Sequence, residues 1–294
     1  MEKIIKKNIN FILTFFIMIS IIIATIFNTI YTNLKKETLL SWFDEMDIYR
    51  QVYEEIQSEF DNYIYQSGLE INTLRNICDE ERIKTDFINT VNTLYDGREY
   101  RIDTYSIKLN LDKEIKEYIN SNGRKINSEE QENIDKFENL IADSYGKSIS
   151  SYISFKDTLH TSLNNFINRC KLLRNIFIIV AIVLTVFLLK MSNDNIYIKI
   201  GFIGVSFFAS GFILIKAKNI IYSNIDINNL IVLTKALSNI IIYIATEMID
   251  TINKAGKYFI LIGLFLIVIT AILGLDADTK IRIKKRQSSN INGI

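Results

Sequence analysis

Apolar residues gather in four long runs, and a polar stretch of the chain separates the first run from the other three. The runs lie at residues 10–29, between 174 and 193, between 199 and 216, and at 258–275. A helix needs about 20 apolar residues to cross a hydrocarbon core of about 30 Å. The pattern therefore predicts four transmembrane helices, with a sizeable domain on one side of the membrane.

The first run differs from a cleaved signal peptide in its length and in the residues after it. The apolar region of a signal peptide has about 7–15 residues and precedes a cleavage site of small residues. The run at 10–29 is longer, and no Ala-x-Ala-like site comes after it. We therefore interpret it as an uncleaved anchor.

Inside the polar stretch, apolar residues first recur in steps of three and four, which is the period of a helix seam. The outgoing seam consists of Leu39, Phe43, Met46, Tyr49, Tyr53, Ile56, Phe60 and Tyr63. No glycine separates this seam from the first run, so one helix is predicted to continue out of the membrane and to end at Gly68. A second helix is predicted from 69 to 95, before Gly97.

A different period begins at 105–111, where apolar and polar residues alternate as they do in a strand. This alternation predicts a loop or small hairpin, followed by a short helix at 112–121. Ser128 then opens a sequence with capping-box spacing. The return seam consists of Ile134, Phe137, Ile141, Tyr145, Ile149, Tyr152, Phe155, Leu159, Leu163, Phe166, Cys170 and Leu173, and it leads directly into the second run.

Together the seams predict an all-α, multi-pass membrane protein with a helical-bundle outer domain on long, coiled-coil-like helical stalks. The residues assigned to the stalk seam are Phe43, Met46, Tyr53, Phe60, Ile141, Tyr152, Leu159 and Phe166. The predicted organisation is an N-terminus with the first span (1–33), the outer domain (34–172), the second and third spans (173–217), a second outer loop (218–257), and the fourth span with a basic tail (258–294).

The second outer loop contains a further apolar segment at 228–248, interrupted by Thr234, Lys235, Ser238 and Asn239. At helical spacing these polar residues form a partial stripe, which predicts an amphipathic helix rather than a span. A fifth transmembrane helix is the alternative, and it would place the basic tail outside.

The orientation is predicted from Lys and Arg in the short loops. With the N-terminus inside, ten of these residues lie in the cytoplasmic segments and five in the short outer loop. Both termini are therefore predicted in the cytoplasm of a cell-membrane protein. The tail residues predicted to face lipid are Lys280, Arg282, Lys284, Lys285 and Arg286.

Composition narrows the function classes. From 34 to 174 the chain carries 19 basic and 26 acidic residues, and such an acidic surface argues against nucleic acid as a partner. Proline is absent, which permits long unbroken helices.

The two cysteines are predicted to be inert buried thiols. The only histidine, His160, has no spacing typical of a catalytic triad or a zinc site. Neither enzymatic activity nor a cofactor or metal is expected.

Small residues in the third and fourth runs predict close helix packing within the membrane. They are Gly201, Gly204, Ser206, Ser210, Gly211 and Gly263.

Two function classes remain. The first is a receptor, sensor or scaffold whose outer domain binds a ligand or partner and is mechanically coupled to the four-helix membrane bundle. The second is an oligomeric channel or permease-like subunit; the topology resembles permease subunits of mechanotransmitting ABC systems, with no motif in common. The expected partners are the lipid bilayer and a protein, which can be a second copy bound through helices.

Overall fold

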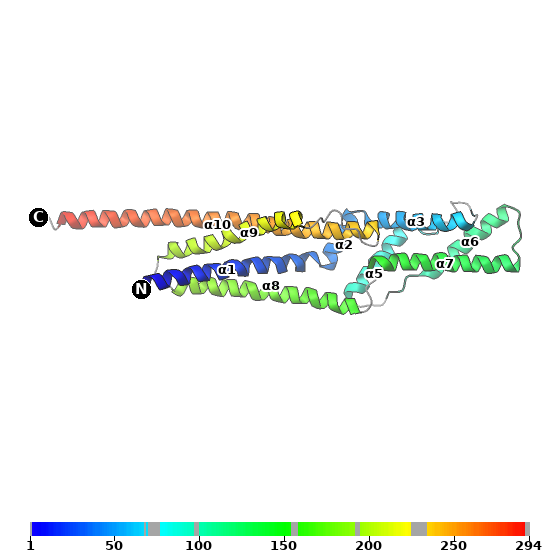
Figure 1. Cartoon of the computed structure of the whole chain (residues 1–294), viewed down its shortest axis with the longest axis horizontal. Coiled ribbons are helices and arrows are strands. Elements are labelled where there is room, and N and C mark those ends of the chain that lie inside the picture. Colours follow the sequence, from blue (N-terminus) through cyan, green and yellow to red (C-terminus); the bar gives the residue numbers. More distant parts are fainter. Residues whose placement is uncertain are drawn as a thin grey trace. The chain divides into compact units, whose positions relative to one another are not determined.

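The computed structural model describes residues 2–67, 69, 77–96, 100–153, 158–191, 195–224 and 234–291. Every regular element in these ranges is a helix, and none of their residues lies in a strand (Figure 1). The chain divides into two compact units. The apolar unit comprises Met1–Asn33, Ile167–Leu230 and Ile242–Ile294, and the polar unit comprises Leu34–Phe166 and Ile231–Ile241.

Four long helices run through the apolar unit: α1 (Glu2–Asn33), α8 (Thr158–Met191), α9 (Ile196–Asn224) and α10 (Lys235–Ile291). Each contains a segment long and apolar enough to cross a membrane, namely Asn8–Asn33, Ser162–Lys190, Ile196–Asn224 and Lys235–Asp276. The prediction of an all-helical chain with four membrane-spanning candidates is thereby confirmed. Their shared core is formed by Leu13, Ile17, Ile21 and Leu188, with Phe202, Phe207 and Phe259 packed around it.

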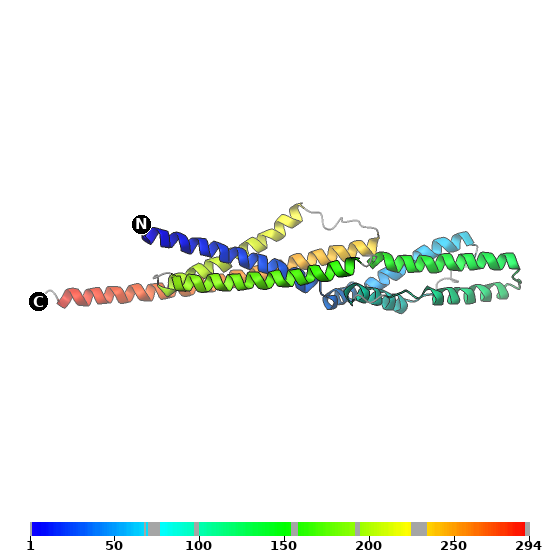
Figure 2. The same cartoon turned by 90° about the horizontal axis from the view of Figure 1, so that it is seen from below.

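Helix α10 is a single element of 57 residues (Figures 1 and 2). Residues 228–233 of the segment expected to form a separate amphipathic helix lie outside the described part of the chain, and from Lys235 the segment continues without a break into the fourth run. A separate fifth span would need the chain to reverse between 248 and 258, and the helix contains no reversal there. Thr234 comes directly before this helix, and Lys235, Ser238 and Asn239 lie in its first turns without ending it.

The polar unit contains α2 (Lys36–Glu45), α3 (Ile48–Ser67), α5 (Glu80–Asp96), α6 (Thr104–Ser121) and α7 (Ser128–Ile153). The prediction of one continuous outgoing helix is wrong, because the helix breaks after Asn33 and again at Asp47. Asp47 has φ of 50°, a left-handed conformation that Asp tolerates better than most residues. The Gln51 side chain donates a hydrogen bond of 2.9 Å to the Met46 carbonyl and so stabilises this turn.

The second predicted helix is also shorter than expected. It begins at Glu80, and residues 77–79 before it are not helical. Residues 70–76, over which the prediction extended, lie outside the described part of the chain.

The expected hairpin at 105–111 is wrong as well, since these residues belong to α6. Asp103 caps this helix by accepting a hydrogen bond from the Ser106 backbone N–H at 3.2 Å. Ile107, Leu111 and Ile115 are buried at intervals of four, whereas Tyr105 and Leu109 are 68% and 50% exposed. The alternation therefore places two apolar side chains in water, and the buried set has the helical period.

Helix α7 is capped one residue earlier than predicted. The Asn127 side-chain oxygen accepts from the backbone N–H groups of Glu129 and Glu130, at 3.0 and 2.9 Å. The Glu130 carboxylate in turn accepts from the Asn127 N–H at 3.0 Å, which completes a capping box. The helix then passes Gly146 without a break. The junction from α7 to α8, at 154–157, lies outside the described residues.

Candidate functional site

A buried carboxylate links two helices of the polar unit. Asp86 on α5 is 4% exposed and accepts hydrogen bonds of 2.5 Å from the hydroxyls of Tyr100 and Tyr145. Arg82, one turn earlier on α5, has its Nε 3.7 Å from the same carboxylate, and its guanidinium lies 5.8 Å from the centre of the Tyr145 ring. We call Arg82, Asp86, Tyr100 and Tyr145 the carboxylate clasp.

The protonation states of the clasp residues favour a structural role over a catalytic one. Burial, and then the hydrogen bond to Asp86, raises the pKa of both Tyr100 and Tyr145, so their hydroxyls remain protonated donors. The nearby Cys78 thiol is 3% exposed, and burial raises its pKa to about 12. A thiol that stays protonated at neutral pH is a weak nucleophile. The clasp therefore fixes α5 against α7.

A second buried carboxyl lies between α6 and α7. Glu138 is 2% exposed, and one of its oxygens has no hydrogen-bond partner among the described residues. Burial, and then the neighbouring carboxyl of Asp112, raises the pKa of Glu138 to about 7. Asp112 itself forms an ion pair of 2.7 Å with Lys116. Within the described part of the chain, no group of three or more His, Cys, Asp or Glu residues is arranged to hold a metal ion.

The start of α10 packs against α3 in the polar unit. The Ala236 backbone N–H donates to the Glu55 carboxylate at 2.9 Å, and the Asn239 side chain donates to Gln51 at 2.7 Å. Ala236 is fully buried and Ile240 is 6% exposed. Since the first N–H groups of a helix have no partner within it, Glu55 satisfies one of them and its negative charge suits that helix end.

In the apolar unit, α9 and α10 approach through glycines. A methyl group placed on Gly211 would lie 2.4 Å from the Gly256 carbonyl oxygen. One placed on Gly263 would lie 2.5 Å from the Phe208 nitrogen and 2.7 Å from the Gly204 carbonyl oxygen. Real side chains do not fit at such distances, so the backbones themselves are in contact.

Another face of α9 meets α1 through serines. Ser206 donates to the Thr14 carbonyl at 3.1 Å, and Ser210 donates to the Met18 carbonyl at 3.2 Å. Each hydroxyl also donates a hydrogen bond to the carbonyl four residues earlier in α9, at 3.1 Å for Ser206 and 2.7 Å for Ser210. The two hydroxyls are fully buried and bonded.

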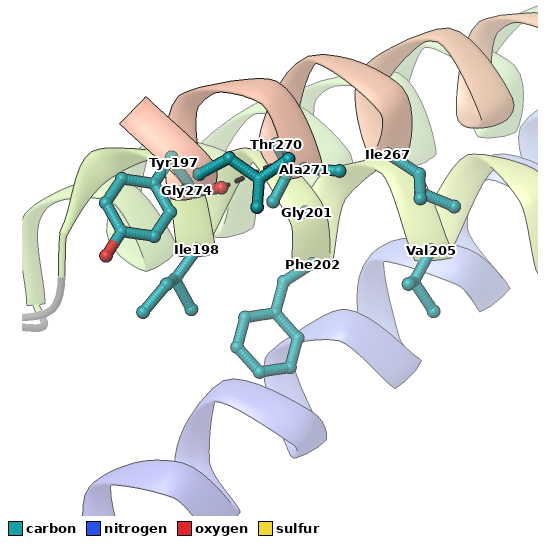
Figure 3. A pocket seen from close by; sticks show the side chains of 10 residues that line it. Tyr197, Ile198, Gly201, Phe202, Val205, Ile267, Thr270, Ala271 and Gly274 are labelled. Atoms are coloured by element: carbon teal, nitrogen blue, oxygen red, sulfur yellow. Dashed lines mark hydrogen bonds between the residues drawn. The ribbon is translucent and has the colours of Figure 1, made fainter. Parts of the chain in front are cut away.

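The small residues singled out in the sequence thus lie on two faces of α9 and on the facing side of α10. Gly201 completes the set: a methyl group there would lie 3.0 Å from the Thr270 methyl on α10. Next to this contact is a pocket of about 610 Å³ (Figure 3). The Thr270 hydroxyl donates to the Tyr197 carbonyl at 3.1 Å, and the pocket is otherwise lined mainly by apolar groups, among them Phe202 and Ile267.

The residues assigned to the stalk seam divide in the structure. Phe43, Phe60 and Ile141 are buried core residues, Met46 and Tyr53 are half-buried, and Phe166 is 47% exposed. The break at Asp47 shifts the buried face of α3, whose inner residues are Ile48, Val52, Ile56, Phe60 and Ile64. The side chains of Tyr152, Leu159 and His160 lie outside the described part of the structure, as do those of the five basic tail residues.

The sequence pattern does not reveal several residues that have a clear structural role. For the carboxylate clasp, only the spacing of Arg82 and Asp86 at i and i+4 is visible in the sequence. Lys199 is 6% exposed, and its ammonium donates to the Leu189 carbonyl at 2.7 Å. It thereby satisfies a carbonyl near the end of α8. Both cysteines are free and buried, as predicted.

Comparison of the chain with protein-family models, with curated proteins and with solved structures finds no match.

Proposed function

We propose that the protein is a membrane receptor, sensor or scaffold in which the polar unit binds a ligand or partner and α10 passes its state to the membrane helices. The proposal rests on α10 belonging to both units. Residues 235–241 pack within the polar unit, and from 242 the same helix belongs to the apolar unit. Because a helix resists bending and rotation within itself, a change at its start is transmitted along its axis.

Helix α8 provides a second connection of the same kind. It begins at Thr158 in the polar unit and continues unbroken to Met191, past the apolar segment of the second run. Neither helix contains a proline, and proline is the usual cause of a sharp kink. Two continuous helices that each contribute residues to both units suit the transmission of a signal between them.

The polar groups of the apolar unit favour this function over a channel or permease. The Thr14 and Thr25 hydroxyls donate to carbonyls of α1 at 2.7 and 2.8 Å, and Ser206 and Ser210 donate to backbone carbonyls of α1 and α9. A conduction path needs polar groups that are available to water or ions. In the described spans these hydroxyls instead donate to backbone carbonyls, those of Thr14 and Thr25 within α1 and those of Ser206 and Ser210 within α9 and to α1.

The proposed orientation places both termini in the cytoplasm and 34–172 outside. Protease added to intact cells should remove this region and leave the basic tail intact. Protection of 34–172 and loss of the tail would reverse the orientation.

Coupling is tested by interrupting α10 between Thr251 and Ile252 with four glycines. An antibody fragment against the polar unit serves as a surrogate partner, and thiol labelling of Cys170 reports on the apolar unit in a Cys78→Ala chain. In the native sequence, binding of the fragment should change the labelling rate by about threefold, a difference of about 0.6 kcal/mol. The glycine insertion should weaken this response, because α8 is then the remaining continuous helix between the two units.

Four alanines at the same position are the matched control, because they extend the helix and rotate its C-terminal part by only about 40° beyond a full turn. The alanine chain should retain a response. An equal response with glycines, or none in the native sequence, would overturn the proposal. Ion flux through the purified protein in liposomes, or co-purification of an ATPase, would favour the channel or permease class instead.

A further inference from the structure

A groove of about 480 Å³ runs between α1, α8, α9 and α10 of the apolar unit. Its walls are mainly aliphatic and aromatic, with Ile21 and Ala24 from α1, Ile178 and Ile182 from α8, and Phe259 from α10. An apolar lining of this kind suits a hydrocarbon chain and offers few partners to a polar metabolite.

One end of the groove is polar and cationic. Asn28 lines the groove, and its side-chain oxygen accepts a hydrogen bond of 3.4 Å from an Arg174 Nη. The Arg174 guanidinium lies 4.7 Å from the centre of the Tyr31 ring, and the Lys171 ammonium lies 5.9 Å from the same ring. The positive charges of Arg174 and Lys171 therefore lie next to the Tyr31 ring, at one end of the apolar groove.

The charge of this cluster is not neutralised within the described residues. The remaining hydrogen bonds of Arg174 go to the neutral Asn175 side chain, at 3.0 and 2.9 Å. No carboxylate of the described residues lies within 4.0 Å of the charged groups of Arg174 or Lys171. These bonds use three of the five N–H donors of the guanidinium, so two are left for an anion.

We propose that this groove binds one anionic phospholipid, with its phosphate at Arg174 and Lys171 and an acyl chain between α1 and α8. Arginine matches a phosphate with paired N–H groups, and basic pockets between membrane helices bind lipid headgroups. Tyrosine is typical of the membrane–water interface, which is where a headgroup lies. The site requires membrane residence and does not depend on the proposed signalling role.

The test is native mass spectrometry of the full chain in detergent with added dioleoyl phosphatidylglycerol or dioleoyl phosphatidylcholine. The native protein should retain one phosphatidylglycerol with at least about tenfold preference over phosphatidylcholine, which corresponds to about 1.4 kcal/mol. Arg174→Gln should remove this preference, and Lys171→Gln, at an exposed side chain, should reduce it without endangering the fold. Arg169→Gln, on the same helix and also exposed, is the matched control and should leave it unchanged.

Filling the groove separates chain binding from headgroup binding. Ala24→Trp keeps every charge and should lower retention of both lipids. Because the acyl chain contributes to binding, millimolar inorganic phosphate should displace little of the bound lipid. Equal retention of the two lipids by the native protein would overturn the proposal. So would an equal loss in Arg169→Gln, or full displacement by phosphate.

Discussion

The interiors of the two units are built from different side chains. In the polar unit, large apolar residues fill the space between helices: Phe87 is fully buried, and its ring meets those of Phe43 and Tyr49 edge-on at 5.3 and 5.8 Å. In the apolar unit, glycines bring α9 and α10 into backbone contact, and serine hydroxyls join α9 to α1. Many large apolar side chains of this unit are exposed, among them Leu261 at 63% and Phe265 at 65%.

The difference matches the solvents proposed for the two units, lipid for the apolar unit and water for the polar unit. In water, burial of apolar area drives helices together, so bulky side chains belong inside. In lipid, apolar side chains gain little by leaving the solvent, and helix association depends on close packing and hydrogen bonds. The exposed side chains of α8 and α10 are accordingly those that a bilayer would cover. Substitutions should therefore destabilise one unit without the other.

Phe87→Ala should have the largest effect. Removal of this ring leaves a cavity and should lower the free energy of unfolding of the polar unit by about 3–5 kcal/mol. Trp42 is the only tryptophan and is buried in the polar unit, so its fluorescence during urea denaturation measures the loss. Tyr105→Ala is the control at a ring that is 68% exposed, and a comparable loss there would contradict the assignment of the core.

Gly211→Ala should act on the other unit. The added methyl meets the Gly256 carbonyl, so α9 and α10 must separate at a cost of about 1–3 kcal/mol. Thermal exposure of Cys170, followed by thiol labelling in a Cys78→Ala chain, should shift to lower temperature while the Trp42 signal stays in place. At Gly274 a methyl would lie 3.8 Å from its nearest neighbour, the Tyr197 ring. Gly274→Ala should therefore be neutral, and an equal shift in both variants would refute the glycine contact.

The Glu138 carboxyl should make the stability of the polar unit depend on pH. Its pKa is raised from 4.5 to about 7, so the folded chain keeps a proton that the unfolded chain loses in this range. The free energy of unfolding should therefore fall by about 1–2 kcal/mol as pH rises from 4.5 to 7. Urea titrations of Trp42 fluorescence at several pH values measure this slope. Glu138→Gln should flatten the curve, whereas Glu132→Gln, at a carboxylate that is 69% exposed, should not.

The smallest effect is expected at the surface of α3. Arg50 and Glu54 form an ion pair of 3.2 Å, and both side chains are 64% exposed. Arg50→Gln should lower the free energy of unfolding by about 0.3–0.5 kcal/mol, because water and salt screen such pairs. Raising the salt concentration in the native protein should produce a similar change. A loss of several kcal/mol would mean that surface charge, and not the buried rings, stabilises this unit.

The sequence determined the elements that depend on local composition. Four long apolar runs are sufficient to predict four helices able to cross a membrane, because the length requirement is set by the bilayer and not by tertiary contacts. The predominance of helix is likewise predicted by seams of period three and four in a chain without proline. The buried face of α6 obeys this period, and the error at 105–111 arose because alternation over a few residues is compatible with both structures.

Tertiary structure decided where helices break and which polar groups meet. No glycine or proline marks the turn at Asp47 in the sequence. The contacts of α2 and α3 with α5 stabilise this turn. Because the turn changes which face of α3 is buried, Val52 is a core residue and Tyr53 is not. The place of the first turns of α10 also depends on tertiary contacts, since Ala236 and Asn239 donate to Glu55 and Gln51, which are far away in sequence. Asp86, Tyr100 and Tyr145 are brought together by folding. Their contact could not be predicted from the sequence, because hydrogen bonds between distant residues leave no periodic pattern in the chain.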